Sequence, residues 1–594
     1  MNIVIFSGGT GSINLQKGLK EFLTENDNYS VIINCYDNGK STGAVRKVMH
    51  GKILGPSDLR KNQEVRSLLS STLNGSILME LKSFLDIRGE ATSAEEFRKL
   101  MINKLLSSSL IEKKLLLENA INAFFNNPEA ENITYTDFSY ANVIYAGLSS
   151  GKLKDILDDS YSLERAGRLM ESVLGIKEDS VTLISDDSLF LQAITKNGDI
   201  ILDEGDIVQW NNSENPIVDI QLVNTEGDKK IPEISNKSKK LIEDADLIIF
   251  SSGTQWSSLI PTYIHKDFYS IIEKSKAKKY LVMNNTDDQD MKDVDSLQLI
   301  SILEKYLPIK DIKIVYNTYA KPLMRKIHTD YKHIYLPLSD HTYSISSVKH
   351  DPYKLAKAII QDFTIGDLNK FDDIIFDFDD TLYGRKNSYP VESLDNLKHF
   401  SNNRKNLIIT GNSLNHINSI FQNLKLFKNS WEIYNEIYTD GGNSKCVFDT
   451  DLKRFVFKEY LHQNLVLTKN DLDRIYSILK EENIPVFKIE NRNNMIISIK
   501  PLSNEDRNSI HQNLSLRLSE FDVVKTGKTT IDIYVKGYNK GLVLEHESFK
   551  NRSILYIGDE IDNGNDSSMK LYSNVTLIRV NNPKETNHFL KIIS

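Results

Sequence analysis

The amino-acid sequence predicts an α/β protein with two domains, each built on a parallel β-sheet. Short apolar strands alternate with segments of helical apolar spacing in both halves of the chain, and this alternation is typical of doubly wound parallel sheets. With 594 residues the chain is too long for one hydrophobic core, so several domains are expected. Polar or Gly-rich turns follow several strands directly, which is where open α/β sheets bind ligands.

The composition restricts the class of protein. Apolar residues make up 40% of the chain and charged residues 26%, as in an ordinary globular protein. A net charge of −8 argues against a nucleic-acid-binding face. The two cysteines, Cys35 and Cys446, lack metal-ligand spacing, so a reducing cytoplasm fits and a disulfide scaffold does not. We expect no signal peptide, no transmembrane span and no membrane partner.

The N-terminal domain begins with a strand, a Gly-rich turn and a helix. Asn2–Phe6 is the strand, Ser7–Gly11 the turn and Ile13–Leu23 the helix. Such a turn lets the backbone approach a phosphate, and the helix N-terminus adds free N–H donors. A Gly-rich turn of purely structural origin is the alternative. Neither the Rossmann glycine spacing nor the Gly-Lys-Ser/Thr end of a P-loop is present, which disfavours nicotinamide dinucleotides and Walker-type ATP hydrolysis.

The remaining N-terminal elements continue the alternation. Residues 63–127 have helical spacing, and His350–Phe363 forms a closing helix before a linker at 364–370. The predicted strands are Val31–Cys35, Val181–Ile184, Leu247–Phe250, Tyr280–Met283 and Ile312–Tyr316.

Six segments together resemble the CofD-like family over residues 1–363. They are Ser7–Gly11, Asp37–Arg46, Gly55–Asn62, Tyr140–Asn142, Asp203–Ile207 and Ser252–Pro261. The family contains the phospholactate transferases of deazaflavin cofactor synthesis and the YvcK-type proteins, which bind UDP-sugars. The resemblance implies a CofD-like doubly wound parallel sheet, with a nucleotide diphosphate or nucleotide-sugar across its strand ends.

The residues that this resemblance implies for ligand binding are Gly9, Thr10, Gly11, Asp37, Asn38, Ser41, Asp58, Arg60, Asn142, Gly253 and Thr254. Arg46 is a further candidate for phosphate, although a salt bridge to a nearby acid is an alternative for Arg46 and Arg60. Asn38 and Lys40 depart from the YvcK-type pattern, and an Asp-His pair expected after Thr286 is missing. The ligand therefore stays open.

The C-terminal domain, residues 371–594, begins with a strand that ends in two carboxylates. Phe376 to Leu382 reads Phe-Asp-Phe-Asp-Asp-Thr-Leu, which places Asp377 and Asp379 at the end of the strand. One carboxylate can attack phosphorus to give an aspartyl-phosphate. The other can protonate the leaving oxygen and later deprotonate water.

Three later features belong to the same pattern. Thr410 ends a second apolar strand, Lys540 precedes a helical stretch, and Asp559 ends a third strand, with Asp566 soon after. Carboxylates gathered at strand ends suit Mg²⁺, which prefers hard oxygen ligands. The order of these four signals resembles the haloacid dehalogenase (HAD) superfamily and implies a Rossmann-like core.

The long segment between Thr410 and Lys540 implies a C2-type α+β cap at about 440–530. Glu490–Ile499 and Thr530–Gly541 resemble phosphomannomutases and sucrose-phosphate phosphatases, where the residue matching Arg492 grips substrate phosphate. By the same resemblance, Asp377 is the nucleophile, Asp379 the general acid/base, and Thr410 and Lys540 hold the phosphoryl group. Mg²⁺ would lie between Asp377, the backbone carbonyl of Asp379 and Asp559, with Asp566 nearby.

These interpretations predict a cytoplasmic, bifunctional phosphotransfer protein. The first domain would transfer a phosphorylated group from a nucleotide diphosphate carrier. The second would be a Mg²⁺-dependent phosphatase acting on a phosphosugar or a small phospho-acid. A UDP-sugar-binding regulator with an attached phosphatase, or a phosphosugar mutase, is the alternative. The oligomeric state stays open, a homo-oligomer included.

Overall fold

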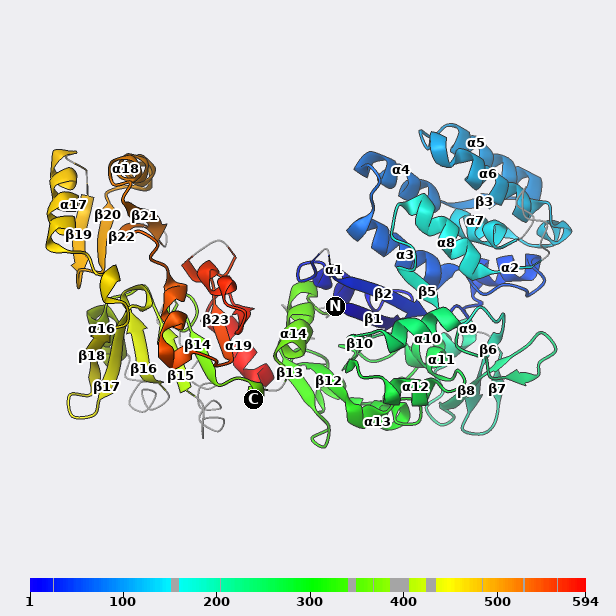
Figure 1. Cartoon of the computed structure of the whole chain (residues 1–594). Coiled ribbons are helices and arrows are strands. Elements are labelled where there is room, and N and C mark those ends of the chain that lie inside the picture. The colour runs from blue at the N-terminus through cyan, green and yellow to red at the C-terminus, as the bar shows by residue number, and fades with distance from the viewer. Residues whose placement is uncertain are drawn as a thin grey trace. The chain divides into compact units, whose positions relative to one another are not determined.

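The computed structural model divides into two compact units, Met1–Phe363 and Thr364–Ser594 (Figure 1). The structure describes residues 1–24, 26–150, 160–202, 204–339, 349–366, 368–384, 405–423, 434–482, 484, 486–526, 529–562 and 565–593.

The first unit is built on a seven-stranded parallel sheet in the order β13-β12-β11-β10-β1-β2-β5. Its strands are β1 (Asn2–Ser7), β2 (Asn28–Ile33), β5 (Val181–Leu183), β10 (Leu247–Phe250), β11 (Lys278–Val282), β12 (Ile312–Asn317) and β13 (His333–Leu336). The order changes direction at β1, because β2 lies on one side of it and β10 on the other. The carboxyl ends of β1 and β10 therefore form the topological switch point, where such sheets bind ligands.

Helices accompany this sheet, and two small antiparallel sheets are added to it. The helices are α1 (Ile13–Leu19), α2 (Lys40–Val48), α3 (Ser57–Ser70), α4 (Gly75–Leu85), α5 (Ala94–Leu106), α6 (Ile111–Phe125), α7 (Tyr140–Ser149), α8 (Leu163–Leu174), α9 (Glu204–Gln209), α10 (Asn236–Glu243), α11 (Ile260–Tyr263), α12 (Phe268–Lys274), α13 (Ser296–Leu303) and α14 (Pro352–Ile365). The added strands are β3 (Arg88–Ala91) with β4 (Tyr135–Ser139), and β7 (Ile200–Ile201), β6 (Phe190–Thr195), β8 (Ile217–Val223) and β9 (Lys229–Lys230) in that spatial order.

The predicted all-helical stretch 63–127 is interrupted by one strand. β3 pairs with β4, and its Gly89 packs closely against Phe97 and Tyr140, so long-range pairing overrides the helical spacing there. Helix α7 is buried along its whole length. Its apolar residues on all sides fit a helix enclosed by protein.

Two buried histidines of the first unit predict how its stability depends on pH. Burial lowers the pKa of His265 and of His350 to about 4 in the folded chain. An unfolded histidine titrates near 6.5, so the unfolded state binds more protons between these values and acid favours unfolding. We expect the free energy of unfolding of this unit to fall from pH 6.5 to pH 4, by up to about 1.4 kcal/mol per pH unit for each histidine.

Urea titrations of the full chain across this range check the prediction. In the fold, Tyr36 Oη lies 2.9 Å from His265 Nε2 and the Thr262 carbonyl lies 3.0 Å from Nδ1. The substitution His265→Gln should flatten the pH dependence, whereas His50→Asn at an exposed position should not. Equal slopes in the wild type and in His265→Gln would contradict the assignment.

The core of the second unit is a seven-stranded sheet in the order β18-β17-β16-β15-β14-β23-β24. Its strands are β14 (Asp373–Phe376), β15 (Lys405–Ile409), β16 (Tyr434–Thr439), β17 (Ser444–Asp449), β18 (Arg454–Tyr460), β23 (Ile554–Gly558) and β24 (Val575–Arg579). The five adjacent strands β16, β15, β14, β23 and β24 are parallel, and the β17–β18 hairpin is antiparallel. The helical segments are α16 (Leu414–Asn423), η8 (Asp440–Gly442), η10 (Lys540–Glu545), η12 (Asn565–Leu571) and α19 (Pro583–Ile593).

A separate α+β subdomain is inserted between β18 and η10. Its antiparallel sheet has the order β19 (Val486–Arg492), β20 (Ile496–Pro501), β22 (Thr530–Val535) and β21 (Phe521–Thr526), and its helices are α17 (Lys469–Glu481) and α18 (Asn504–Arg517). These elements share a hydrophobic core of their own. The fold class predicted from the sequence is therefore confirmed.

The cap begins later than the predicted position near residue 440. β17 and β18 extend the core sheet, because Cys446 and Phe455 of this hairpin are buried in the core cluster that also contains Phe376 and Ile408. Among the helices that the structure describes, none combines the length and apolar character needed to cross a membrane.

Candidate functional sites

The second unit gathers charged side chains at the carboxyl edge of its parallel strands. Asp377 directly follows β14, Thr410 follows β15 and Asp559 follows β23. These strands are parallel neighbours, so their carboxyl ends meet at one edge of the sheet. Lys540 begins η10 and Asp566 lies in η12, and both reach the same place.

Lys540 joins two carboxylates in the interior of this site. Its Nζ forms an ion pair with Asp377 Oδ1 and donates a hydrogen bond to Asp566 Oδ1 at 2.7 Å. Tyr556 Oη donates to the same Asp566 oxygen at 2.6 Å. Asp377 is 5% exposed, Lys540 4% and Asp566 0%. A buried charge is tolerated only when it is paired, and here one cation pairs with two acids.

The electrostatics of the site leave one negative charge in excess. Burial raises the pKa of Asp377 well above its ordinary value, Lys540 opposes this shift, and Asp566 adds to it. Burial alone would lower the pKa of Lys540, but the charges of Asp377 and Asp566 outweigh burial and raise it. Burial and the charge of Asp566 raise the pKa of Asp559 to about 6. The group therefore has room for a further positive charge.

Asp377, Asp559 and Asp566 could hold a metal ion. Each offers a carboxylate oxygen, and these oxygens lie within 4.8 Å of one another. Three hard oxygen donors fit Mg²⁺. The close packing of Asp566 against the β23 terminus requires glycine at position 558, because a Cβ there would lie 2.2 Å from Asp566 Oδ2.

Asp379 lies apart from this group of oxygens. The residue is exposed overall, although protein surrounds its carboxyl group, and Asn412 Nδ2 donates to its Oδ2 at 2.5 Å. The surrounding protein raises the pKa of Asp379 by desolvation, and the Asn412 hydrogen bond opposes that shift. The predicted contact of the Asp379 backbone carbonyl with a metal stays a prediction. Asn412, which also donates its N–H to Thr410 Oγ1 at 3.1 Å, was not predicted, although it closes the Thr-Gly-Asn turn after β15.

The cap contributes side chains to the same edge of the sheet. Arg492, at the end of β19, donates through Nη1 to the Gly411 carbonyl at 2.8 Å, one residue from Thr410. Asn493 Nδ2 donates to Asp440 Oδ2 at 3.3 Å. Asp440 was not predicted as a site residue, yet it follows β16 just as Asp377 follows β14. A pattern of strand-end acids could have indicated it.

In the first unit, two turns meet at the switch point. The turn after β1 contains Gly9, Thr10 and Gly11, and the turn after β10 contains Gly253 and Thr254. Ser252 Oγ donates to the Gly11 carbonyl at 3.4 Å, and a Cβ on Gly11 would lie 1.7 Å from the Ser252 carbonyl oxygen. The structure thus brings together the two predicted phosphate-binding turns.

This contact makes Gly11→Ala a test of the switch point. A methyl group at position 11 would force the two turns apart, so we expect unit 1 to lose about 2 kcal/mol of stability or more and to bind nucleotides less tightly. The matched change is Gly253→Ala, because the nearest atom to a Cβ there is 3.4 Å away. Urea unfolding and nucleotide titration measure both variants. Equal stability in both would contradict the packing argument.

The N-terminus of α3 lies against the first turn. Asn62 Nδ2 donates to the Gly8 carbonyl at 2.9 Å, and a Cβ on Gly9 would lie 2.6 Å from Asp58 Oδ1. Lys61 Nζ pairs with Asp58 Oδ1 at 3.2 Å. Asp58 therefore lies next to Gly9, while their shared role in ligand binding stays a prediction, and Lys61 and Asn62 are neighbours that were not predicted as site residues.

Asp37 and Glu204 are two further carboxyl groups near Asp58. The Gly39 N–H donates to Asp37 Oδ1 at 2.8 Å. Burial and the nearby Asp37 charge raise the pKa of Glu204 to about 8, and burial raises the pKa of Asp58. Asp203, from the same predicted motif as Glu204, lies outside the described residues.

Asn142 joins the first turn of helix α2 to helix α7. Its Nδ2 donates to Ser41 Oγ at 3.1 Å, while its Oδ1 is buried and has no hydrogen-bond partner in the described part of the chain. Arg60 Nη1 donates to Ser139 Oγ at 2.9 Å, and Ser139 caps α7. Asn38 packs closely against α2, which carries Ser41, because a Cβ on Gly43 of that helix would lie 2.2 Å from the Asn38 carbonyl oxygen.

Arg46 is wrong as a phosphate ligand. Its guanidinium donates to the Ile53 carbonyl at 3.1 Å and the Leu189 carbonyl at 2.7 Å, and lies 4.0 Å from the centre of the Phe190 ring. With 1% exposure, Arg46 holds backbone segments together.

An acid pair after β11 was also not predicted. Gln255 N donates to Asp288 Oδ2 at 3.0 Å and Ser257 N donates to Asp290 Oδ2 at 2.7 Å. Burial and the adjacent Asp290 raise the pKa of Asp288 to about 9. Asn284 Oδ1 accepts from Gly253 N at 2.9 Å, so the turn after β10 is held by the segment after β11.

Comparisons with known proteins agree with the resemblance of the first unit. Residues 149–335 match the family model described as 2-phospho-L-lactate transferase CofD. A protein of Thermotoga maritima named "Putative gluconeogenesis factor" is 26% identical over 287 residues, which cover 48% of this chain and 68% of that protein. A protein of the same name from Aquifex aeolicus is 22% identical over 285 residues, covering 48% and 67%. The first unit is therefore similar to the CofD family, in agreement with the resemblance found in the sequence.

Solved structures similar to the chain fall into two groups. A UPF0052 family member from Bacillus halodurans is 17% identical, has a TM-score of 0.42, and is covered over 98% of its length by 60% of this chain. A haloacid dehalogenase-like hydrolase from Bacteroides thetaiotaomicron is 14% identical, has a TM-score of 0.27, and is covered over 98% by 38% of this chain.

Proposed function

We propose that this chain joins a nucleotide-diphosphate-binding CofD-like domain to a Mg²⁺-dependent phosphatase of the HAD type. One observation carries the phosphatase: Lys540 is buried between Asp377 and Asp566 at a strand edge, with Asp379 two residues from Asp377. This arrangement supplies a carboxylate nucleophile, a cation for the phosphoryl group and a second carboxyl for proton transfer.

In the proposed reaction, a carboxylate oxygen of Asp377 forms a bond to phosphorus while the bond from phosphorus to the ester oxygen breaks. Asp379 gives its proton to the leaving oxygen. In the second step, Asp379 takes a proton from water as the water oxygen attacks phosphorus, releasing Asp377 and inorganic phosphate. Lys540 and Thr410 hold the phosphoryl oxygens. A Mg²⁺ ion held by Asp377, Asp559 and Asp566 would neutralise charge on them.

The position of Arg492 supports a small phosphorylated substrate. Its Nη1 is bonded to the Gly411 carbonyl beside Thr410, while its Nε is buried without a partner among the described residues. The cap thus brings a guanidinium to the strand edge, where it can bind an anionic group of the substrate. A phosphosugar or a small phospho-acid fits this expectation.

The test is phosphate release by the full chain from a panel of phosphosugars and phospho-acids, with Mg²⁺ or with EDTA. Turnover that requires Mg²⁺ and yields free phosphate supports the phosphatase. Phosphate moved to another hydroxyl of the sugar, with a need for a sugar bisphosphate, would identify a mutase instead. No turnover of any substrate would contradict both.

For the first unit, we propose that the diphosphate of a nucleotide lies across the turns at Gly9–Gly11 and Ser252–Thr254, with Asp37 and Asp58 facing the reacting end. Transfer of the phosphorylated group would then link the two units in consecutive steps. The alternative is a sensor that binds a UDP-sugar without turnover; the two bacterial relatives are named as factors and not as transferases. Incubation with nucleotide-sugars and product analysis separates them, because a sensor returns its ligand intact and Asp37→Ala then changes only binding.

A further inference from the structure

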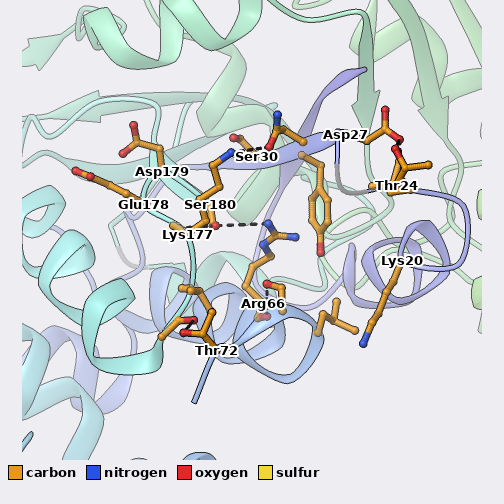
Figure 2. Close-up of a pocket in the computed structure, with 17 residues that line it drawn as sticks. Lys20, Thr24, Asp27, Ser30, Arg66, Thr72, Lys177, Glu178, Asp179 and Ser180 are labelled. Atoms are coloured by element: carbon orange, nitrogen blue, oxygen red, sulfur yellow. Dashed lines mark hydrogen bonds between the residues drawn. The ribbon is translucent and has the colours of Figure 1, made fainter. Parts of the chain in front are cut away.

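The first unit has a pocket at the opposite edge of its sheet from the nucleotide site. The pocket has a volume of about 540 Å³ and is lined by residues from the end of α1, the start of β2, the end of α3 and the segment 175–180 (Figure 2). Asn28 is the first residue of β2 and Ser180 directly precedes β5, so the pocket lies at the amino ends of these strands. This volume suits a small molecule.

Arg66 occupies the middle of this pocket. Figure 2 shows it between Lys177 and Ser180 on one side and Lys20 on the other. Arg66 is 7% exposed, and its guanidinium lies 3.5 Å from the centre of the Tyr29 ring. The stacking holds the planar group in one orientation.

The charge of Arg66 is not balanced within the described part of the chain. Its guanidinium has no ion pair with a described carboxylate, its Nη2 donates to Ser180 Oγ at a long 3.5 Å, and its Nε is buried with no hydrogen-bond partner. Buried arginines are normally paired with an acid, since desolvating an unpaired charge is unfavourable. Arg66 is thus a buried cation whose neutralising anion is not supplied by the described residues.

The acids around the pocket do not neutralise Arg66. Asp27 accepts hydrogen bonds from the N-terminal amine at 2.8 Å and from Thr24, and Asp179 forms an ion pair with Lys237. Lys20 and Lys177 add positive charge at the rim, and Glu178 is an exposed acid among the lining residues. The interior of the pocket is therefore positive.

We propose that this pocket binds a small anionic metabolite through a phosphoryl or carboxylate group, with Arg66 as the central contact. Arginine binds both groups with two parallel N–H donors. The site is separate from the one at the switch point, although α3 connects them: Asp58 and Asn62 contact the Gly-rich turn at one end, and Arg66 reaches the pocket towards the other.

Hydrogen exchange of the full chain, read by mass spectrometry, tests the proposal. Inorganic phosphate and succinate are the two probes. Each is titrated up to about 20 mM, which detects dissociation constants in the millimolar range. Either probe should slow amide exchange at least about threefold in peptides from 20–30, 66–72 and 175–181, equivalent to about 0.65 kcal/mol. Protection by phosphate alone identifies a phosphoryl site and protection by succinate alone a carboxylate site. No protection by either overturns the proposal.

Two variants establish that Arg66 carries the binding. Arg66→Met should abolish protection of these peptides while the slow amide exchange of the buried helix α7 stays as in the wild type, which shows that the first unit is folded. Lys177→Gln should weaken protection severalfold, whereas Lys196→Gln, at an exposed position outside the pocket, should not. Unchanged protection in both pocket variants would overturn the assignment.

Discussion

Replacing Asp377 with Asn is expected to lower phosphate release by on the order of 10⁴-fold or more. An amide oxygen cannot form the aspartyl-phosphate, and no described carboxylate stands in the same position between Lys540 and the neighbouring acids. The measurement is phosphate release under saturating substrate and Mg²⁺, together with trapping of the phosphorylated chain by rapid acid quench. Wild-type protein should carry label from the substrate on Asp377, and the variant none.

The matched control is Asp380→Asn, which removes the same charge three residues further along. Asp380 has φ of 50°, a conformation that asparagine adopts readily, so the backbone is preserved. This variant should retain the wild-type rate. If both variants lose activity equally, the effect is one of local structure or charge, and Asp377 is not the nucleophile.

Replacing Lys540 with Met is expected to destabilise the second unit by about 3–5 kcal/mol and to abolish phosphate release. The change leaves two buried carboxylates, Asp377 and Asp566, without their shared cation. These acids could then reduce the loss only by taking up protons. The destabilisation should therefore be larger at pH 8 than at pH 5, because protons are scarcer at the higher pH.

Urea unfolding of the full chain at both pH values measures this effect. Lys536→Met is the control, because Lys536 is exposed and its Nζ donates a hydrogen bond to the Ser519 carbonyl of the cap at 3.0 Å. It should change the free energy of unfolding by no more than about 0.5 kcal/mol. A loss in Lys540→Met that does not depend on pH would contradict the buried charge network.

Local sequence determined the sheets and the acids that follow their strands. Apolar strands such as Ile374–Phe376 and Ile554–Ile557 end directly in Asp377 and Asp559, and adjacent parallel pairing brings these ends together. Because a strand places its next residue at the edge of the sheet, position along the chain already indicates position in space. Gly9 and Gly11 closely follow β1 and Gly253 closely follows β10, so their positions along the chain likewise indicate that they lie at this edge of the sheet.

Tertiary structure decided which charged groups are partners. Asp377 and Lys540 are 163 residues apart, and only the family resemblance brought Lys540 to the site. Arg46 and Arg66 both lie on helices of the first unit, yet Arg46 donates to backbone carbonyls, whereas Arg66 faces a pocket and forms no ion pair with a described acid. The hairpin Ser444–Tyr460 extends the core sheet and not the cap, because its apolar residues are buried in the hydrophobic core of that sheet. The sequence specifies the charge of each side chain. Its desolvation and its partners depend on segments that packing brings together from distant parts of the chain.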